Sequence, residues 1–299
     1  HTAIVNPESW HAYGDEFGRV VADGTGPYRL VSYSPEEVVA ARVAADPLPA
    51  TIRWRAVEEP ADRLEVLQRR SADVVRAVAE VPGDGHWQLH DRPENSQFYL
   101  ALNHTDARGF GDPQFRRAVE AFLDRERIVE RALGGAGDPR RSPIPAADQF
   151  AAAYQPVAPM SPARAHRALA ELGWAPGPEG VLQRDGAALR IDCVAQDTDV
   201  CRRIAQVVAE QLAVAGIELR FSFESLFEPF YRAVEANPPA FLSKWLWTDA
   251  MEAVYGFSRS DCVEPAGGNW QLAACHEVDA AFDRFREAVG LGELTATDR

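Results

Sequence analysis

The feature that most constrains the fold is a strand–helix–strand pattern in the second half of the chain. Apolar residues alternate with polar ones over residues 189–193 and again over 217–223, which is typical of half-buried strands. Between these runs, apolar residues recur at helical spacing from Ile204 to Leu212, and Gly216 ends the pattern. A helix that connects two strands in this way predicts the α/β fold class.

The first half shows a similar alternation of strands and helices. A turn at Gly24 and Gly26 leads into the first expected strand, and a helix is expected from Pro60 to about Arg70. The expected strands cover residues 28–33, 38–43, 52–57, 72–75 and 98–103. Two α/β sheets joined near residue 103 predict two lobes with a ligand cleft between them, formed by residues 1–103 and 104–299.

Two further helices carry clear signals at their ends. Asp112 is expected to cap a helix over residues 113–133, which Gly134 ends. A second capped helix is expected over residues 161–172. The segment between these helices is rich in Pro, Gly and Ala, so it is expected to be mostly loop.

Composition and charge exclude several classes of protein. Of the 299 residues, 46% are hydrophobic, which is far too rich for a disordered chain. The formal net charge is −14, whereas nucleic-acid binders usually present a basic surface, so no nucleic-acid partner is expected. No apolar run approaches the roughly 20 residues of a membrane helix. The chain begins at His1 without a charged and apolar leader, and we expect it to be a fragment of a longer protein.

Enzyme and cofactor signatures are missing from the sequence. It contains no phosphate-binding loop, no His-Glu-x-x-His and no Gly-x-Ser-x-Gly motif. His86 and His90 lie in an alternating segment, where residues four apart are roughly 13 Å apart and too distant to share one ion. We therefore expect no catalytic residues, no metal and no cofactor.

A tryptophan-rich stretch is the best candidate for a ligand site. Trp245 and Trp247 lie on one face of an expected strand, and Asp249 follows at its end. Three more candidates come later in the chain: Tyr255, Asn269 and Trp270. Either indole alone fits a core position as well as a cleft wall. The whole group favours a cleft, because aromatic walls with a few fixed polar groups are typical of small-molecule sites.

Several segments occur together, and in the same order, in one protein family. They are Gly24–Leu30, Leu64–Val75, Leu102–Asn103, Phe110–Val119, Asp124–Val129, Ser142–Pro145, Ala168–Trp174 and Gln211–Ile217. In these segments the chain resembles the family 5 extracytoplasmic solute-binding proteins, which are the oligopeptide-, dipeptide- and nickel-binding components of ABC importers. The resemblance spans nearly the whole chain.

The resemblance implies a type 2 periplasmic-binding fold, in which two α/β lobes close over a ligand and catalyse no reaction. It implies capture of a peptide-like or other small polar organic solute, delivery to the permease subunits of an ABC transporter, and a periplasmic or extracellular location. The membrane would be reached only through the transporter or through an N-terminal lipid anchor outside this chain. Family members carry further N-terminal and C-terminal segments, so the first lobe is expected to be incomplete here.

Two details of the resemblance concern the ligand site. Many peptide binders carry an aspartate where this chain has Thr248, and the shift of the carboxylate to Asp249 argues against an anchor for a peptide α-amine. Some dipeptide-binding relatives carry a cystine in the loop that Cys262 and Cys275 flank, so this pair is expected to bond in an oxidising compartment. The spacing of the four cysteines alone fits unrelated buried thiols equally well.

The same fold also serves a second class of protein. The alternative function is the ligand-sensing domain of a cytoplasmic transcriptional regulator. A secretory signal before His1 would favour the importer, and a winged-helix segment would favour the regulator. A hydrolase is disfavoured, because the sequence offers no nucleophile with a paired base.

Overall fold

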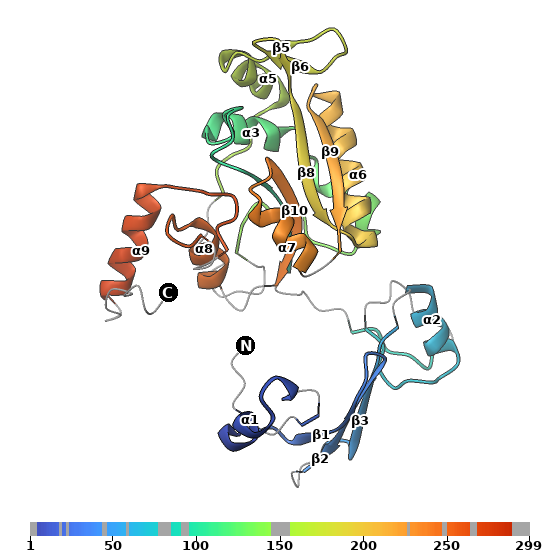
Figure 1. The fold of residues 1–299 in the computed structure, drawn as a ribbon. Coiled ribbons are helices and arrows are strands. Elements are labelled where there is room, and N and C mark those ends of the chain that lie inside the picture. Colours follow the sequence, from blue (N-terminus) through green and yellow to red (C-terminus); the bar gives the residue numbers. More distant parts are fainter. Residues whose placement is uncertain are drawn as a thin grey trace. The chain divides into compact units, whose positions relative to one another are not determined.

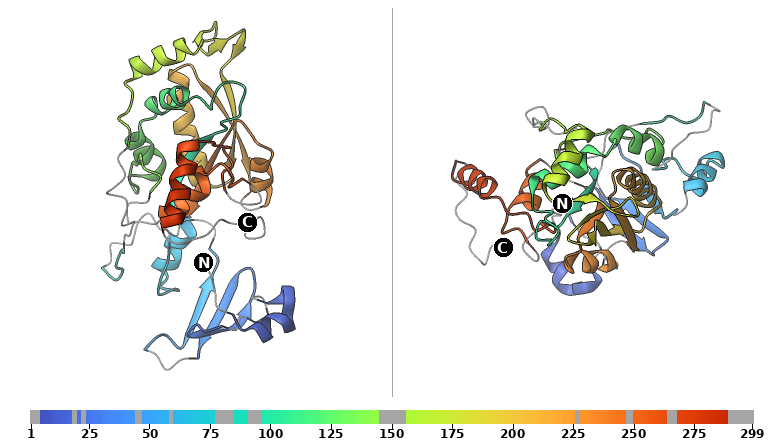
Figure 2. Two further views of the ribbon diagram at one scale, coloured as in Figure 1. Left: turned by 90° about the vertical axis from the view of Figure 1, so that its left-hand side faces the viewer. Right: turned by 90° about the horizontal axis from the view of Figure 1, so that it is seen from above.

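The computed structural model describes residues 5–17, 20–21, 24–43, 47–57, 60–76, 85–90, 96–144, 156–225, 228–246, 250–263 and 268–288. The chain divides into two compact units, His1–Asp91 and Arg92–Arg299, and each is described by itself (Figures 1 and 2). This division differs from the boundary predicted at residue 103, because the strand before that residue pairs within the second unit. The assignment of the units to the two lobes of a binding protein remains a prediction.

The first unit is built around an antiparallel sheet of three strands. The strands are β1 (Tyr28–Tyr33), β2 (Glu37–Arg42) and β3 (Thr51–Arg55), paired in the order β1-β2-β3. Its helices are α1 (Pro7–Tyr13), which the side chain of Asn6 caps, the short 3-10 helix η1 (Gly14–Glu16), and α2 (Pro60–Gln68). Each strand therefore pairs with the strand that follows it in sequence, and no helical crossover joins them.

The strand predicted over residues 72–75, after the helix that starts at Pro60, is wrong, and with it any strand–helix–strand crossover in this half. The segment from Ala72 to Val75 forms no strand, and Val74 is 80% exposed. A short apolar run becomes a strand only where a neighbouring strand accepts its backbone hydrogen bonds. Among the described residues this run pairs with no strand, so its hydrophobicity alone does not fix its conformation.

The second unit contains a four-stranded sheet of order β4-β10-β8-β9. Its strands are β4 (Ser96–Leu102), β8 (Arg190–Gln196), β9 (Glu218–Glu224) and β10 (Ala240–Leu246). β8 runs parallel to β9 and β10, whereas β4 is antiparallel to β10. α6 (Asp199–Val214), which Thr198 caps, connects β8 to β9. The α/β class predicted from this part of the sequence is confirmed.

The long helix predicted after residue 112 is two helices, α3 (Pro113–Ala121) and α4 (Arg125–Leu133). Asp112 caps α3 as expected, since its Oδ1 accepts a hydrogen bond of 2.7 Å from a backbone N–H in the first turn. Asp124 caps α4 in the same way at 2.9 Å and so separates the two helices. Gly134 ends α4 in the left-handed conformation, with φ of 60°.

Other elements complete the second unit. The sequence predicts helices over residues 161–172, 229–236 and 277–289. The structure has α5 (Pro162–Glu171), α7 (Glu228–Glu235) and α9 (His276–Ala288) at these positions. Four elements were not predicted: α8 (Ala250–Ser258) and the small antiparallel sheet of β5 (Ala175–Pro176), β6 (Leu182–Arg184) and β7 (Ala187–Ala188). None of the helices that the structure describes combines the length and apolar character needed to cross a membrane.

The sheet of the second unit separates two hydrophobic clusters, because successive side chains of a strand point to opposite faces. On one face α6 contributes Leu212 to a large core that includes Ile191 of β8. On the other face, Phe230 of α7 belongs to a smaller cluster that includes Phe241 of β10. The smaller cluster contains most of the aromatic side chains near the expected ligand site.

Candidate functional site

The parallel strands of the second unit end at one edge of the sheet, and the candidate ligand residues begin there. β8 ends at Gln196, and Trp245 is the next-to-last residue of β10. Ligands of α/β sheets commonly bind outside the carboxyl ends of the strands. Trp247 and Asp249 follow β10 in sequence but lie outside the described residues, so their part in the site remains a prediction.

Trp245 belongs to a group of side chains that we call the aromatic cluster. Its members are Tyr99, Phe230, Tyr231, Phe241, Trp245, Phe257 and Trp270. The ring centroid of Trp245 lies 5.2 Å from that of Trp270 and 5.4 Å from that of Phe257. The ring planes of Trp245 and Trp270 meet at 68°, which is the edge-to-face geometry that aromatic quadrupoles favour.

Strands β4 and β10 form the sheet side of the aromatic cluster. Phe241 and Trp245 are separated by an even number of positions, so the pleat places both on one face of β10. The antiparallel register sets Tyr99 of β4 opposite Ser243, which lies between them on that face. Fully buried Phe230 covers this face from α7. Alternation along each strand therefore places aromatic rings from β4 and β10, which are far apart in sequence but adjacent in the sheet, on the same face.

Neutral polar side chains cross the strands next to the aromatic cluster. Gln196 Nε2 donates to Ser243 Oγ at 3.0 Å, and the backbone N–H of Lys244 donates to Gln196 Oε1 at 3.3 Å. Burial raises the pKa of the Tyr99 phenol well above its usual range, so this group is a neutral donor at physiological pH. This end of the site therefore presents uncharged polar groups.

Asn269 and Trp270 lie in the interior of the second unit. Trp270 is 7% exposed, and its ring contacts four other members of the aromatic cluster. Asn269 is fully buried, and its Nδ2 donates to the backbone oxygens of Arg259 at 2.9 Å and of Ala273 at 2.7 Å. Its Oδ1 accepts from the backbone N–H of Ala273 at 2.9 Å. In this structure the Asn269 amide orders its own loop.

Tyr255 is half-buried and joins α8 to α9. Its ring lies 5.0 Å from that of Phe282, at an angle of 82°, and the Arg259 guanidinium lies 5.6 Å from its centroid. Arg259 also donates to Asp261 Oδ1 and Asp283 Oδ1, each at 2.6 Å. Hydrogen bonding to Asp261, and then to Asp283, raises the pKa of Arg259. The described contacts of Tyr255 support the fold, and its contact with a ligand remains a prediction.

The disulfide predicted between Cys262 and Cys275 is not formed in the structure, which holds all four cysteines as thiols. Cys262 is buried, whereas Cys275 is exposed immediately before α9. The Cys275 thiol donates to Glu277 Oε2 at 3.3 Å. The hydrogen bonds of Asn269 hold the intervening loop, so its described part is ordered without a covalent link.

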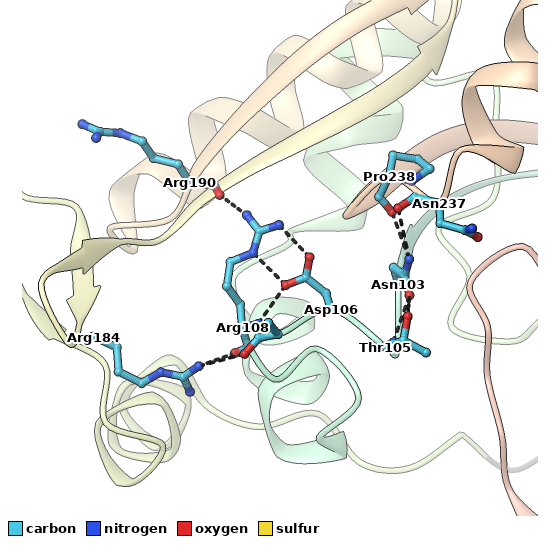
Figure 3. Close-up of polar contacts among 9 residues, drawn as sticks. Asn103, Thr105, Asp106, Arg108, Arg184, Arg190, Asn237 and Pro238 are labelled. Atoms are coloured by element: carbon cyan, nitrogen blue, oxygen red, sulfur yellow. Dashed lines mark hydrogen bonds and ion pairs between the residues drawn. The ribbon is translucent and has the colours of Figure 1, made fainter.

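Sequence reasoning missed a charged network at the opposite edge of the sheet, which we call the arginine lock (Figure 3). Asp106 accepts hydrogen bonds of 2.7 Å from both Nε and Nη2 of Arg108. The same guanidinium donates to the backbone oxygen of Arg190, where β8 begins, and Arg184 of β6 donates to the backbone oxygen of Arg108 at 3.0 Å. The lock therefore fastens the loop after β4 to two other strands.

Asn103 fastens the beginning of β10 at that same edge. Its Nδ2 donates to the backbone oxygens of Asn237 at 3.3 Å and Pro238 at 3.4 Å, and its own N–H donates to the oxygen of Pro239 at 2.9 Å. Its Oδ1 accepts from the hydroxyl of Thr105 at 2.8 Å. Asn103 was part of the family resemblance, but no local spacing reveals partners that are 134 residues away.

In the described part of the chain, no group of three or more His, Cys, Asp or Glu side chains is placed to hold a metal ion. Burial, with the nearby charge of Arg116, lowers the pKa of His104 to about 4. This histidine is therefore neutral at physiological pH.

Comparison with known proteins places the chain in a family. The model of the bacterial extracellular solute-binding proteins, family 5 Middle, matches residues 4–263. The glutathione-binding protein GsiB of Salmonella choleraesuis is 26% identical over 232 residues, which are 74% of this chain and 43% of the relative. GsiB of Escherichia coli O157:H7 is 25% identical over 228 residues, which are 73% of this chain and 42% of the relative.

Solved structures share the fold at lower identity. The periplasmic oligopeptide-binding protein of an oligopeptide ABC transporter from Thermotoga maritima gives a TM-score of 0.74 at 18% identity, covering 94% of this chain and 59% of that one. The oligopeptide-binding protein AppA of Bacillus subtilis, in complex with a nonapeptide, gives 0.67 at 20% identity, covering 87% and 54%. The chain thus spans about half the length of the relatives it matches. Both the predicted resemblance and the fold class are confirmed, and the chain belongs to family 5 of the bacterial extracellular solute-binding proteins.

Proposed function

We propose that the protein containing this chain captures a small polar organic solute outside the cytoplasm and delivers it to the permease subunits of an ABC transporter. Membership in a family of extracellular solute-binding proteins supports this role. The relatives include proteins named for glutathione binding and for oligopeptide binding. Since the chain spans about half of these relatives, the solute and the permease are inferred for the whole protein.

The single observation that supports a ligand site on this chain is the aromatic cluster, which lies near the carboxyl ends of the parallel strands. Trp245 is half-buried and lies in the same cluster as Tyr99, whereas Trp270 is only 7% exposed. A mostly apolar surface with few polar groups suits a small organic ligand. We infer that Trp247 and Asp249, the next candidates in sequence, extend this surface.

This role needs binding without catalysis. The family consists of binding proteins, and we infer that the chain is not an enzyme. The related proteins are extracellular or periplasmic, which favours a periplasmic location or the outer face of the cell membrane over a cytoplasmic regulator. No nucleic-acid partner is inferred.

Native mass spectrometry of the whole protein that contains this chain, purified without refolding, tests the proposal. The wild-type protein should carry a non-covalent mass that matches a small solute. Trp245→Ala should carry much less of it, because removing an aromatic wall costs on the order of 1–3 kcal/mol of binding. Phe285→Ala is the matched control, since this residue is an exposed aromatic on α9. A wild-type protein without any bound solute, or a Trp245 variant that carries as much as wild type, would contradict the proposal.

A further inference from the structure

Polar side chains attach α9 to the rest of the second unit. None of the 13 residues of this helix, all of which the structure describes, is buried. Asp279 accepts hydrogen bonds from the backbone N–H of Ser260 at 3.0 Å and from its hydroxyl at 2.7 Å. One turn further along the helix, Asp283 Oδ1 accepts from Nη1 of Arg259 at 2.6 Å. Both contacts of α9 therefore end on two neighbouring residues that directly follow α8.

The backbone of Arg259 holds the loop that carries Asn269 and Trp270. Its oxygen accepts from Nδ2 of Asn269 at 2.9 Å and from the N–H of Cys262 at 3.2 Å. The backbone N–H of Asn269 in turn donates to the oxygen of Cys262 at 2.8 Å. Arg259 thus contacts α9 through its guanidinium and the candidate ligand loop through its carbonyl group.

Trp270 carries this connection into the aromatic cluster. It follows Asn269 directly in the chain, so the hydrogen bonds of that amide fix where its backbone lies. Its ring centroid is 5.2 Å from that of Trp245, at the carboxyl end of β10. A continuous series of contacts therefore runs from α9 to the candidate ligand site. Its members are Asp283, Arg259, Asn269, Trp270 and Trp245.

The position of the Arg259 guanidinium depends on its two acidic partners. The side chain is only 12% exposed, and a shielded charge is costly unless acceptors satisfy it. Its Nε donates to Asp261 Oδ1 at 2.6 Å, within the same turn of chain, whereas Asp283 belongs to a separate helix. A displacement of α9 that moves Asp283 therefore either breaks a hydrogen bond to a shielded charge or moves Arg259 with it.

We propose that Arg259 is a positioning residue of the ligand site, which couples α9 to the loop that carries Trp270. This inference rests on the proposed function and adds a residue that acts on the same site without touching the solute. Coupling between two segments is reciprocal. α9 holds the loop in order before a solute arrives, which lowers the ordering cost of binding, and a solute held by Trp270 stabilises α9.

Hydrogen–deuterium exchange of the whole protein that contains this chain tests the coupling. Asp283→Asn removes the charge of a side chain that is 57% exposed, so the fold should tolerate it. The N–H groups of Leu272 and Ala273, which donate to Asn269, should then exchange about threefold to fivefold faster. Asp283→Glu keeps the carboxylate and should restore exchange to within about twofold of wild type. Glu287→Gln, an exposed carboxylate on the same helix, is the matched control and should exchange as wild type does.

The pattern of exchange separates positioning from a merely structural role. If Asp283→Asn speeds exchange in α9 alone, or equally in the loop and in β8, the coupling is overturned.

Native mass spectrometry of the same variants adds a binding readout. The mass that co-purifies with the protein should be lost on dilution about threefold to fivefold faster from Asp283→Asn than from wild type, because a loop that opens more often releases it more often. Equal rates of loss would overturn the role of Arg259 in binding. A wild-type protein without a co-purified mass would contradict the proposed function, and the exchange comparison, which needs no solute, would still decide whether α9 and the loop are coupled.

Discussion

Replacing Asp106 by Asn should weaken the arginine lock and destabilise the second unit. The side chains of this ion pair are well shielded, with Asp106 13% exposed and Arg108 27% exposed. Asparagine preserves the size of the side chain but removes its charge and one of its two acceptor atoms. Arg108 would then keep its charge and its bond to the backbone of Arg190 while losing its strongest partner.

The expected loss in the free energy of unfolding follows from the two hydrogen bonds of 2.7 Å that Asp106 accepts from the Arg108 guanidinium. A hydrogen bond to a charged group is worth about 1.5–3 kcal/mol, and partial exposure of the pair favours the lower end, so we expect a loss of about 2 kcal/mol. Asp138 and Arg140 form an ion pair of 2.6 Å with the same chain spacing, but Asp138 is 59% exposed. Asp138→Asn is thus a matched control and should cost less than about 0.5 kcal/mol.

The loss should depend on pH in a defined direction. Burial alone would raise the pKa of Asp106, but hydrogen bonds from the Arg108 side chain and backbone, with its charge, outweigh burial and lower it. A carboxyl group with a lowered pKa in the folded state stabilises the fold above its unfolded pKa, and this stability is lost as the pH falls through the folded pKa. The difference in free energy of unfolding between wild type and Asp106→Asn should be largest at neutral pH and should shrink below about pH 4.

Urea unfolding at a series of pH values, followed by circular dichroism, measures this gap directly. The unfolding slope should be the same for all three chains, so that midpoints report stability. Equal losses in the Asp106 and Asp138 variants would refute the role assigned to the lock. A gap that stays constant down to pH 3 would refute the assigned charge contribution.

Three other changes test separate features. Arg70→Gly should raise the free energy of unfolding by about 0.5–1 kcal/mol and with it the melting temperature. Arg70 follows α2 with φ of 53°, a conformation in which a Cβ is strained and which glycine, without a Cβ, adopts freely. An unchanged or lower melting temperature would contradict this. Asp112→Ala should cost about 1 kcal/mol in urea unfolding and leave ligand affinity unchanged, whereas a matching loss of affinity would show that the cap also shapes the site. Cys275 is exposed and should react with a maleimide in the native chain. Cys193 is buried, which raises the pKa of its thiol, so it should react only after unfolding. A linked Cys262–Cys275 peptide in a non-reducing digest would disprove the thiol assignment.

Local signals in the sequence located most elements of the second unit, because caps and periodicity act within a few residues. The break at Asp124 was missed, since this residue also fits the charged face of one continuous helix. Its position is fixed by Gln211, whose Oε1 accepts from the Asp124 N–H at 2.9 Å and whose Nε2 donates to the Asp124 oxygen at 3.2 Å. These two residues are 87 positions apart, so no pattern along the chain reveals the contact.

Only part of the candidate site could be predicted from the sequence. The alternation along β10 identified Trp245, because a strand's period of two is a local property. Tyr99 was missed, since sheet pairing alone brings it opposite Ser243. Asn269 is predicted as a ligand contact because a polar residue beside a tryptophan fits a cleft. The structure shows both ends of its amide bonded to the backbone, and its contact with a ligand remains a prediction. Residue type predicts which chemistry is available, and only the fold determines what each group contacts.

The separation of functions along β10 matters for engineering. Asn103 holds the beginning of this seven-residue strand, whereas Trp245 stands near its end, roughly 20 Å away at the usual rise per residue. A library that varies the positions after Trp245, where the sequence predicts the ligand contacts Trp247 and Asp249, would therefore leave the contacts of Asn103 that anchor the strand unchanged. The second unit is thus suited to display new binding loops as a biosensor, with Asn103 and the Asp106–Arg108 pair kept constant.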